Sequence, residues 1–301
     1  RKTIVELRKT GKKDMKNLLL IGFVVSLALA GCGGESPEGQ LASAKEYLRK
    51  KDSKAAAIQI KNVLQKQPDS GEARFLLGTT LLQQGNVAGA EVELRKALVA
   101  QYSKDEVVPE LARAMLLLGQ AKKMVDEFSG MQLSKPSAQA SLQTSLASAY
   151  ATLGQGSASQ AALSAALVAD KTYVPAQLLE ASRKAAAHDF DGALATIETV
   201  LQIDANSPEA WTLKGDLLLY GKADGDAALN AYRQAVAAAP DSLSAQFALV
   251  AQLIGKGDLE GAGRQLEQVK KLAPKHPTTR FSRPSPTARA VGCFTRSGMR
   301  R

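Results

Sequence analysis

The sequence predicts an all-α fold in which about seven helical pairs stack as a superhelical solenoid. Hydrophobic residues make up 45% of the chain, enough for a sizeable core, but aromatic residues make up only 5%. Alanine and leucine supply most of the apolar surface, which favours closely packed helices over a β-sandwich. A motif of small and large apolar residues also recurs with a period of about 34 residues. A fixed period of this length is typical of a helical repeat array.

An export signal begins at Met15, with Lys16 as its positive charge. The apolar run that follows occupies positions 18–30. A membrane-spanning helix needs about 20 apolar residues, so this run is too short to be one. We therefore interpret residues 15–31 as a signal peptide. Residues 1–14 lack this character, and we interpret them as an upstream extension that takes no part in the fold.

The signal ends in the string Leu-Ala-Gly-Cys, which resembles the bacterial lipobox. The resemblance implies that the thiol of Cys32 receives a diacylglycerol anchor and that this residue becomes the new N-terminus. The polar residues 32–39 then form a short tether. The residue after the cysteine, Gly33, resembles the type directed to the outer membrane. We therefore expect a periplasmic protein that is lipid-anchored to the inner face of the outer membrane.

The body of the chain, residues 40–277, carries the repeating motif. Each copy has a small residue, a large apolar residue four positions later, and a small or branched apolar residue three positions after that. The copies are Ala56/Ile60/Val63, Ala90/Leu94/Ala97, Ser159/Leu163/Ala166, Ala193/Ile197/Val200, Ala228/Tyr232/Ala235 and Ala262/Leu266/Val269. A degenerate copy, Met124/Phe128/Met131, lacks the small residue. The nearly constant distance between successive copies predicts seven equivalent second helices.

The first helix of each pair and the turn between pairs carry their own marks. Small residues mark the first helix at Gly78, Ala147 and Gly215, and prolines close the second helix at Pro68, Pro240 and Pro274. Together with Trp211, these marks resemble the tetratricopeptide repeat, although Lys214 stands where that pattern has leucine. The resemblance implies a tetratricopeptide-type α-α superhelical solenoid of about seven repeats.

The small residues have a steric role in such a repeat, because a larger side chain would push the two helices of a pair apart. We expect Gly78 and Gly215 to face the small residue of the second helix, which is Ala228 in the sixth pair. The large residues, such as Leu94 and Tyr232, should fill the space toward the next pair.

The first helices are expected to line a concave face of the array. Residues on that face are the candidates for binding a protein partner. We predict that Lys45, Thr79, Ser182 and Asp216 belong to this partner-binding face. Asp216 can also be interpreted as an ordinary solvent-facing charge.

The composition changes abruptly after Pro277. Residues 278–301 are rich in arginine, have no acidic residue and show no apolar period. One interpretation is a basic tail for nucleic acid. The other, which we favour, is a terminus read out of frame, because the wrong frame of a GC-rich gene gives Arg, Pro, Ser, Gly and Cys. We expect this aberrant segment to be disordered, since it has little apolar surface to bury.

The formal net charge of +10 comes from the two ends of the chain. Residues 1–14 have a net charge of +4 and residues 275–301 of +7, whereas residues 15–274 have a net charge of −1. A nucleic-acid-binding protein needs a concentrated basic surface to displace the counterions of the phosphates. We therefore expect no nucleic-acid partner.

No catalytic or metal-binding motif is found in the sequence. Both cysteines lie outside the repeating body, and the two histidines, His188 and His276, lie in different pairs. The motifs of zinc proteases, serine hydrolases and nucleotide-binding loops are absent. The acidic turns at 189–191 and 224–226 could hold a cation weakly, but we interpret them as solvated turn residues. We therefore predict no enzyme activity, no cofactor and no metal.

Four strings in the first two pairs resemble one family in particular. They are AKEYL at 44–48, IQIKNVLQ at 58–65, EARFLLG at 72–78 and AEVELRKAL at 90–98. Together with the lipobox, they resemble the tetratricopeptide-repeat lipoprotein of the PEP-CTERM/exosortase protein-sorting system. Members of that family are usually much longer, so the resemblance implies that this chain is an N-terminal fragment. It also implies a link to exopolysaccharide production.

The sequence thus predicts a lipid-anchored periplasmic scaffold that binds protein partners of envelope export or polysaccharide assembly. One alternative is a tetratricopeptide lipoprotein of pilus or outer-membrane assembly. An alternative of another class is the repeat module of an enzyme whose catalytic domain is lost by truncation.

Overall fold

The computed structural model describes residues 36–273. Within this range the chain forms fourteen α-helices and one π-helix, with no β-strand, and the predicted all-α fold is confirmed. The predicted signal peptide 15–31, the lipidation residue Cys32 and the tail 278–301 lie outside the described residues. The last residues of the predicted array, 274–277, lie outside them too.

The described helices alternate as seven first helices and seven second helices, as the repeat period predicts. The first helices are α2 (Pro37–Arg49), α4 (Gly71–Gln83), α6 (Lys104–Leu117), α8 (Pro136–Thr152), α10 (Val174–Ala186), α12 (Pro208–Asp216) and α14 (Leu243–Gly255). The second helices are α3 (Ser53–Lys66), α5 (Val87–Val99), α7 (Ala121–Phe128), α9 (Gly156–Ala169), α11 (Phe190–Ile203), α13 (Gly225–Ala238) and α15 (Leu259–Leu272). The π-helix η2 (Leu217–Gly221) directly follows α12 and completes the sixth first helix.

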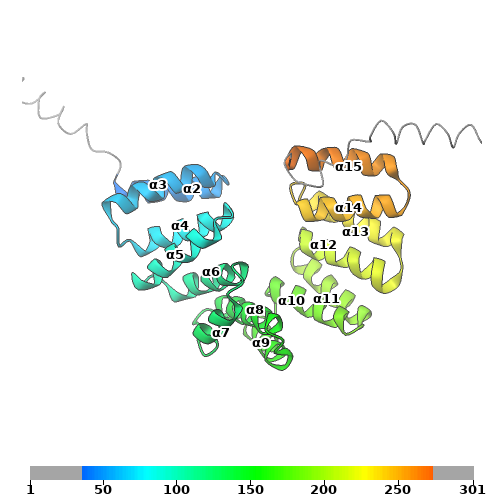
Figure 1. Cartoon of the computed structure of the whole chain (residues 1–301), viewed down its shortest axis with the longest axis horizontal. Coiled ribbons are helices and arrows are strands. Elements are labelled where there is room, and N and C mark those ends of the chain that lie inside the picture. The colour runs from blue at the N-terminus through cyan, green and yellow to red at the C-terminus, as the bar shows by residue number, and fades with distance from the viewer. Residues whose placement is uncertain (1–35, 274–301) are drawn as a thin grey trace, which may run out of the picture. The chain divides into compact units, whose positions relative to one another are not determined.

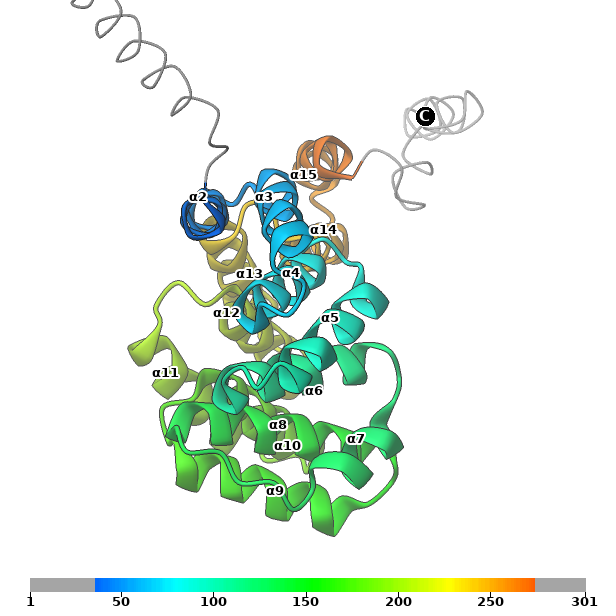
Figure 2. The same ribbon diagram turned by 90° about the vertical axis from the view of Figure 1, so that its left-hand side faces the viewer.

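Two compact units make up the chain, one ending at Leu118 and the other beginning at Gly119. In the first unit the pairs α2–α3 and α4–α5 stack in order, and α6 packs on α5 (Figure 1; Figure 2). In the second unit α7 packs on α8, and the pairs from α8–α9 to α14–α15 follow one another. The third pair, α6 and α7, is divided between the units. It is also the pair whose motif is degenerate, at Met124.

Each pair turns from its first to its second helix through one residue with positive φ. These residues are Lys51 (61°), Gly85 (77°), Gly119 (69°), Gly154 (72°), His188 (61°), Ala223 (55°) and Gly257 (79°). Each of them stands five positions before the start of a motif copy, so the turns and the sequence motif share one period. Glycine adopts this left-handed conformation freely, whereas a residue with a side chain loses about 1–2 kcal/mol there. The left-handed conformation of the turn residue therefore depends on its position in the repeat, even where that residue is not glycine.

Short polar side chains cap most of the helices. Five second helices begin after Asp52, Asn86, Asp189, Asp224 or Asp258, whose side chains accept from the backbone N–H three residues on at 2.8–3.1 Å. Serines cap α2, α4, α12 and α14 in the same way. The five consecutive helices α6 to α10 have no such side-chain hydrogen bond. Each cap contributes about 1 kcal/mol to its helix.

The close contact inside a pair differs from the one expected. A Cβ on Gly78 would lie 2.6 Å from Cγ of Leu94, and a Cβ on Gly215 would lie 2.5 Å from Cε1 of Tyr232. The nearest second-helix atoms therefore belong to the large residue of the motif, and not to the small residue Ala228 as we expected. In these two pairs the large side chain therefore occupies the space that the missing Cβ of glycine leaves.

The other steric expectations are met in particular pairs. In the fourth pair the two small residues do meet, since the hydroxyl of Ser159 donates to the carbonyl of Ala147 at 2.8 Å. Besides covering the glycine of its own pair, Tyr232 joins an apolar cluster with Leu249 and Leu253 of α14. This residue therefore also reaches the next pair, as expected.

Two boundaries differ from the predicted ones. Helix α2 begins at Pro37, so the predicted tether 32–39 loses its last three residues to the helix. Proline has no N–H to leave unpaired at the start of a helix, and Ser36 caps this one, which together explain the early start. Helix α7 ends at Phe128, so Met131, the last residue of the degenerate motif, is not on the helix.

The steric account predicts opposite effects for two glycine-to-alanine substitutions. Gly215→Ala should lower the free energy of unfolding by about 1–3 kcal/mol, because the new methyl group overlaps the ring of Tyr232. Gly263→Ala is the matched control: this glycine lies inside α15 with open space around it, so alanine should stabilise the helix by about 0.5–1 kcal/mol. Urea unfolding measures both, and equal effects of the two substitutions would contradict the assigned contact.

Candidate functional site

A groove in the second unit is built from the first helices of three consecutive pairs. Helices α10 and α12 and the start of α14 surround a volume of 310 Å³. Its polar lining consists of Ser182, Glu209, Thr212, Asp216, Ser242 and Ser244, and Leu178 and Leu213 are part of its apolar lining. The groove is long enough to touch three repeats at once, so it can receive a segment of another chain.

Two of the predicted site residues, Ser182 and Asp216, lie together in this groove. They stand one repeat period apart, and each directly follows the small buried residue of its helix, Ala181 or Gly215. One residue further along an α-helix lies about 100° further around its axis. When the small residue faces the second helix, the next side chain therefore turns toward the groove.

Asp216 is held by a hydrogen bond from the second helix of its own pair. The hydroxyl of Tyr232 donates to Oδ1 of this carboxylate at 2.7 Å. Burial raises the pKa of Tyr232 well above its ordinary value, and the hydrogen bond to Asp216 raises it further. The hydroxyl therefore keeps its proton at neutral pH and stays a donor. The ring that covers Gly215 thus also fixes the carboxylate at the edge of the groove.

The helix that carries Asp216 changes its geometry directly after this residue. The turn residues His188 and Ala223 lie one position further apart than Gly154 and His188 do, and η2 accommodates the additional residue. Inside η2, Gly221 packs so closely on the ring of Phe190 that a Cβ would lie 2.5 Å from Cδ1. Turns of π-helix are frequently found at functional sites.

The groove is acidic. Its two charged lining residues are Glu209 and Asp216, and in the part of the chain that the structure describes neither has a lysine or arginine partner. Other carboxylates of the second unit do have one, such as Asp191, which pairs with Lys222 at 2.5 Å. The negative charge of the groove is therefore not neutralised by neighbouring side chains.

The other two predicted residues, Lys45 of α2 and Thr79 of α4, lie in the first unit. They also stand one repeat period apart and hold the equivalent position of their helices. The amine of Lys45 pairs with Glu72 of α4 at 2.6 Å, and the hydroxyl of Thr79 donates to the carbonyl of Leu76 at 3.1 Å. Both side chains thus have partners within the unit. Of the four predicted residues, the structure brings Ser182 and Asp216 into one groove.

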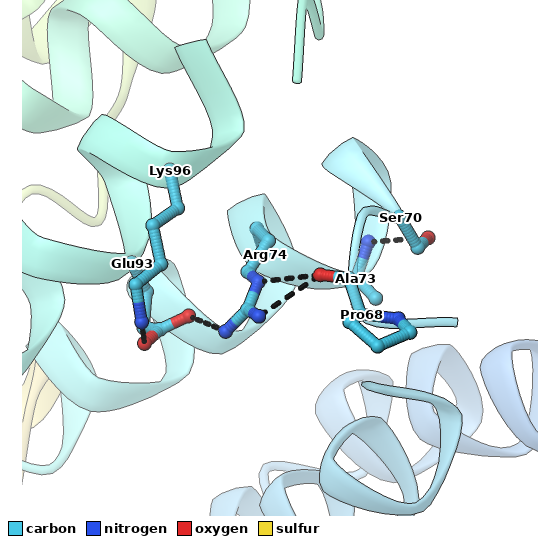
Figure 3. Close-up of polar contacts among 6 residues, drawn as sticks. All are labelled: Pro68, Ser70, Ala73, Arg74, Glu93 and Lys96. Atoms are coloured by element: carbon cyan, nitrogen blue, oxygen red, sulfur yellow. Dashed lines mark hydrogen bonds and ion pairs between the residues drawn. The ribbon is translucent and has the colours of Figure 1, made fainter. Parts of the chain in front are cut away.

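A second polar network lies between α4 and α5 (Figure 3). Arg74 donates through Nε and Nη2 to the carbonyl of Pro68 at 3.1 and 2.9 Å, and its Nη1 pairs with Glu93 at 2.6 Å. Lys96 also donates to Glu93, at 2.9 Å. Burial acts to raise the pKa of Glu93, but the hydrogen bonds from Lys96 and Arg74 outweigh it and hold that pKa below its ordinary value. These bonds tie the turn before α4 to α5.

The bond from Arg74 to a carbonyl six residues earlier recurs in other pairs. The equivalent donors are Gln177 to Lys171 at 2.7 Å, Trp211 to Ala205 at 2.9 Å and Gln246 to Pro240 at 2.7 Å. Each donor holds the same place in its first helix and reaches the turn between two pairs. The role of this position is therefore structural. The donors share an N–H group but not a residue type, so Trp211 alone could be recognised from the sequence pattern.

We interpreted the acidic turns as solvated turn residues, and the structure shows that they also have structural roles. Asp189 and Asp224 cap α11 and α13, and Asp226 pairs with Lys256 at 2.7 Å. Among residues 36–273 no group of three His, Cys, Asp or Glu side chains could hold a metal ion. In the same range no helix has both the length and the apolar character needed to cross a membrane.

Comparisons with known proteins agree with this architecture. Residues 41–106 match the model of the tetratricopeptide repeat family. A tetratricopeptide repeat protein from Parabacteroides merdae is 14% identical, with a TM-score of 0.58 over 82% of this chain and 97% of that one. A chain of the APC/C heterotetramer Cut9–Hcn1 is 15% identical, with a TM-score of 0.60 over 77% of this chain and 45% of that one. No curated protein matches. At these identities the likeness shows the fold alone, an all-α tetratricopeptide-type solenoid.

The bond between Tyr232 and Asp216 predicts a pH dependence of stability. The pKa of Tyr232 is raised in the folded protein above the value of about 10 that it has when unfolded. The stabilisation is therefore fully present below about pH 10 and is lost as the pH rises further, because the unfolded chain releases its proton first. Tyr232→Phe, which removes the titrating hydroxyl, should lose less of its urea midpoint between about pH 9 and about pH 11 than the original chain does. Asp216→Asn keeps the burial of Tyr232 and an acceptor for its hydroxyl but removes the negative charge, so its loss should lie between those of Tyr232→Phe and the original chain. Identical pH profiles would contradict the assigned bond.

Proposed function

We propose that this chain is a periplasmic scaffold that is held to a membrane by a lipid on Cys32 and binds protein partners with its first helices. A tetratricopeptide-type solenoid is suited to protein–protein interaction, because stacked repeats present one extended surface. The export signal and the lipobox string support the anchor. Gly33 supports the inner face of the outer membrane as its location.

The observation that carries the binding role is the groove between α10, α12 and α14. Three successive first helices contribute polar side chains to one volume of 310 Å³ without closing it against solvent. Equivalent positions of successive helices, such as those of Ser182 and Asp216, therefore act together. A single repeat presents too few of these positions to recognise a partner, whereas a stack of three repeats presents enough.

The polar residues best support a function in binding, without catalysis. The acidic turns are used in helix caps and ion pairs, and Arg74 and Glu93 connect two helices. We therefore propose a scaffold that is not an enzyme. The rival of another class is a repeat module whose catalytic domain is encoded outside the present sequence. Sequencing the complete gene tests that rival directly.

The partners that we propose are proteins of envelope export or polysaccharide assembly that work with PEP-CTERM/exosortase sorting. The support for this choice is the resemblance of the strings at 44–48, 58–65, 72–78 and 90–98 to the lipoprotein of that system. The same fold also suits the alternative, a lipoprotein of pilus or outer-membrane assembly. The identity of the bound protein distinguishes the two.

Photocrosslinking in the native host tests both the groove and the partner class. A photoreactive amino acid replaces Thr212 inside the groove or, as a matched control, Val168, which is 87% exposed on the second helix α9. We expect cross-links from position 212 to proteins of exosortase-dependent sorting or exopolysaccharide assembly, and few from position 168. Pilus subunits cross-linked at position 212 would favour the alternative. Equal cross-linking at both positions would count against the groove as the binding face.

Replacing the lipidation residue tests the anchor. Cys32→Ser removes the thiol to which a diacylglycerol would be attached, so incorporation of a labelled fatty acid should be lost and the protein should leave the membrane fraction. Each buried CH₂ of an acyl chain contributes about 0.8 kcal/mol to membrane binding, which makes a diacyl anchor durable. A mutant that still incorporates the label refutes the proposal. The tail cysteine provides the control, because Cys293→Ser should leave the labelling unchanged.

A further inference from the structure

We propose that the groove between α10, α12 and α14 binds an extended segment of the partner protein through two basic side chains, one paired with Asp216 and one with Glu209. This inference rests on the proposed function, in which the groove binds a protein, and it adds the chemistry of the bound segment. The structure supports it through the charge of the groove, through the direction of its hydrogen bonds and through the spacing of its carboxylates.

The negative charge of the groove is not balanced by cations nearby. Arg183 stands next to the groove residue Ser182, but Glu180 holds its guanidinium through two hydrogen bonds of 2.8 and 2.7 Å. On α12, Lys214 lies over the ring of Trp211 at 5.5 Å from its centroid and within 3.6 Å of Glu198 on α11. Both cations are engaged elsewhere, so the carboxylates of the groove attract a basic ligand and repel an acidic one.

Two hydroxyl groups of the groove use their protons on the backbone of their own helix, and those of Ser242 and Ser244 lie 3.0 Å apart, so that one of them donates to the other. Thr212 donates to the carbonyl of Pro208 at 2.7 Å, and Ser182 donates to the carbonyl of Leu178 at 2.9 Å. A hydroxyl that donates in this way keeps only its lone pairs for a ligand. Together with the two carboxylates, they make the groove rich in acceptors and poor in donors. A ligand with many donors, such as a lysine or arginine side chain on a peptide backbone, fits this lining.

The two carboxylates are too far apart for a single cation. Asp216 follows Glu209 by two helical turns on the same helix, and at about 1.5 Å per residue this separation is about 10 Å. An ion pair needs atoms within about 4 Å, so each carboxylate requires its own basic side chain. In an extended peptide of polyproline II conformation, which has three residues per turn and a rise of about 3.1 Å per residue, residues three positions apart lie on the same side and are separated by about 9 Å. The spacing therefore points to two lysines or arginines separated by two other residues.

A positional-scanning library of short peptides tests this proposal on the purified full chain in detergent. The peptides are acetylated at the N-terminus and amidated at the C-terminus, so that only side-chain charge differs among them. We expect lysine and arginine to be selected at two positions three residues apart. Removing one charged hydrogen bond should weaken binding about tenfold, so Asp216→Asn should abolish the selection at one position and Glu209→Gln at the other.

The variants are chosen to leave the fold intact. The amide oxygen of Asp216→Asn can still accept a hydrogen bond from the hydroxyl of Tyr232, and Glu209 is exposed in the first turn of α12. Glu260→Gln removes one exposed negative charge from α15, outside the groove, and should keep both selections. Glu209→Lys reverses the charge and should select aspartate or glutamate at the position that Glu209→Gln affects.

The possible outcomes distinguish a failure of this proposal from a failure of the proposed function. Selection of acidic residues, of no charge, or of a basic residue at a single position overturns this proposal but leaves the proposed scaffold function standing. Loss of both selections in Glu260→Gln also overturns it, because the charge preference would then not belong to the groove. A chain that binds no peptide of any class contradicts the proposed function as well.

Discussion

The contact between Gly215 and the ring of Tyr232 connects the packing of this protein to its candidate site. Because the first helix has no Cβ at this point, the ring of the second helix can lie directly against its backbone. The same placement brings the tyrosine hydroxyl to Asp216, at 2.7 Å. In the second pair Gly78 makes the corresponding contact with Leu94, which has no polar group to offer. The second and sixth pairs therefore share this glycine contact. In the sixth pair, which carries tyrosine, the contact also brings a hydrogen bond to the groove.

Much of the fold could be predicted because one spacing is repeated throughout the chain. The intervals between motifs equal the intervals between the left-handed turn residues, so the periodicity of the sequence is the periodicity of the backbone. The turns themselves were harder to predict, since Lys51, His188 and Ala223 adopt positive φ without being glycine. The hydrogen bond to the preceding turn was also missed, because arginine, glutamine and tryptophan supply equivalent donors and share no apolar pattern.

The candidate site was predicted in part for a similar reason. Ser182 and Asp216 occupy the first-helix position that follows the small residue, and that position could be found from the period alone. Glu209 was missed because its place in the groove depends on how the start of α12 lies beside α14, which no local pattern in the sequence reports. Lys45 and Thr79 hold the same position in the first unit, where Glu72 and the backbone supply their partners.

The uneven distribution of helix caps has a consequence for cooperativity. A repeat array behaves approximately as a row of segments, each with its own intrinsic stability and a coupling to its neighbours. Helices α6 to α10 form without the capping hydrogen bond that the helices on either side have. These helices, in the middle of the described chain, therefore lack one local source of stability that the other described α-helices have. Partial opening should begin there and spread toward both ends, instead of fraying inward from the termini.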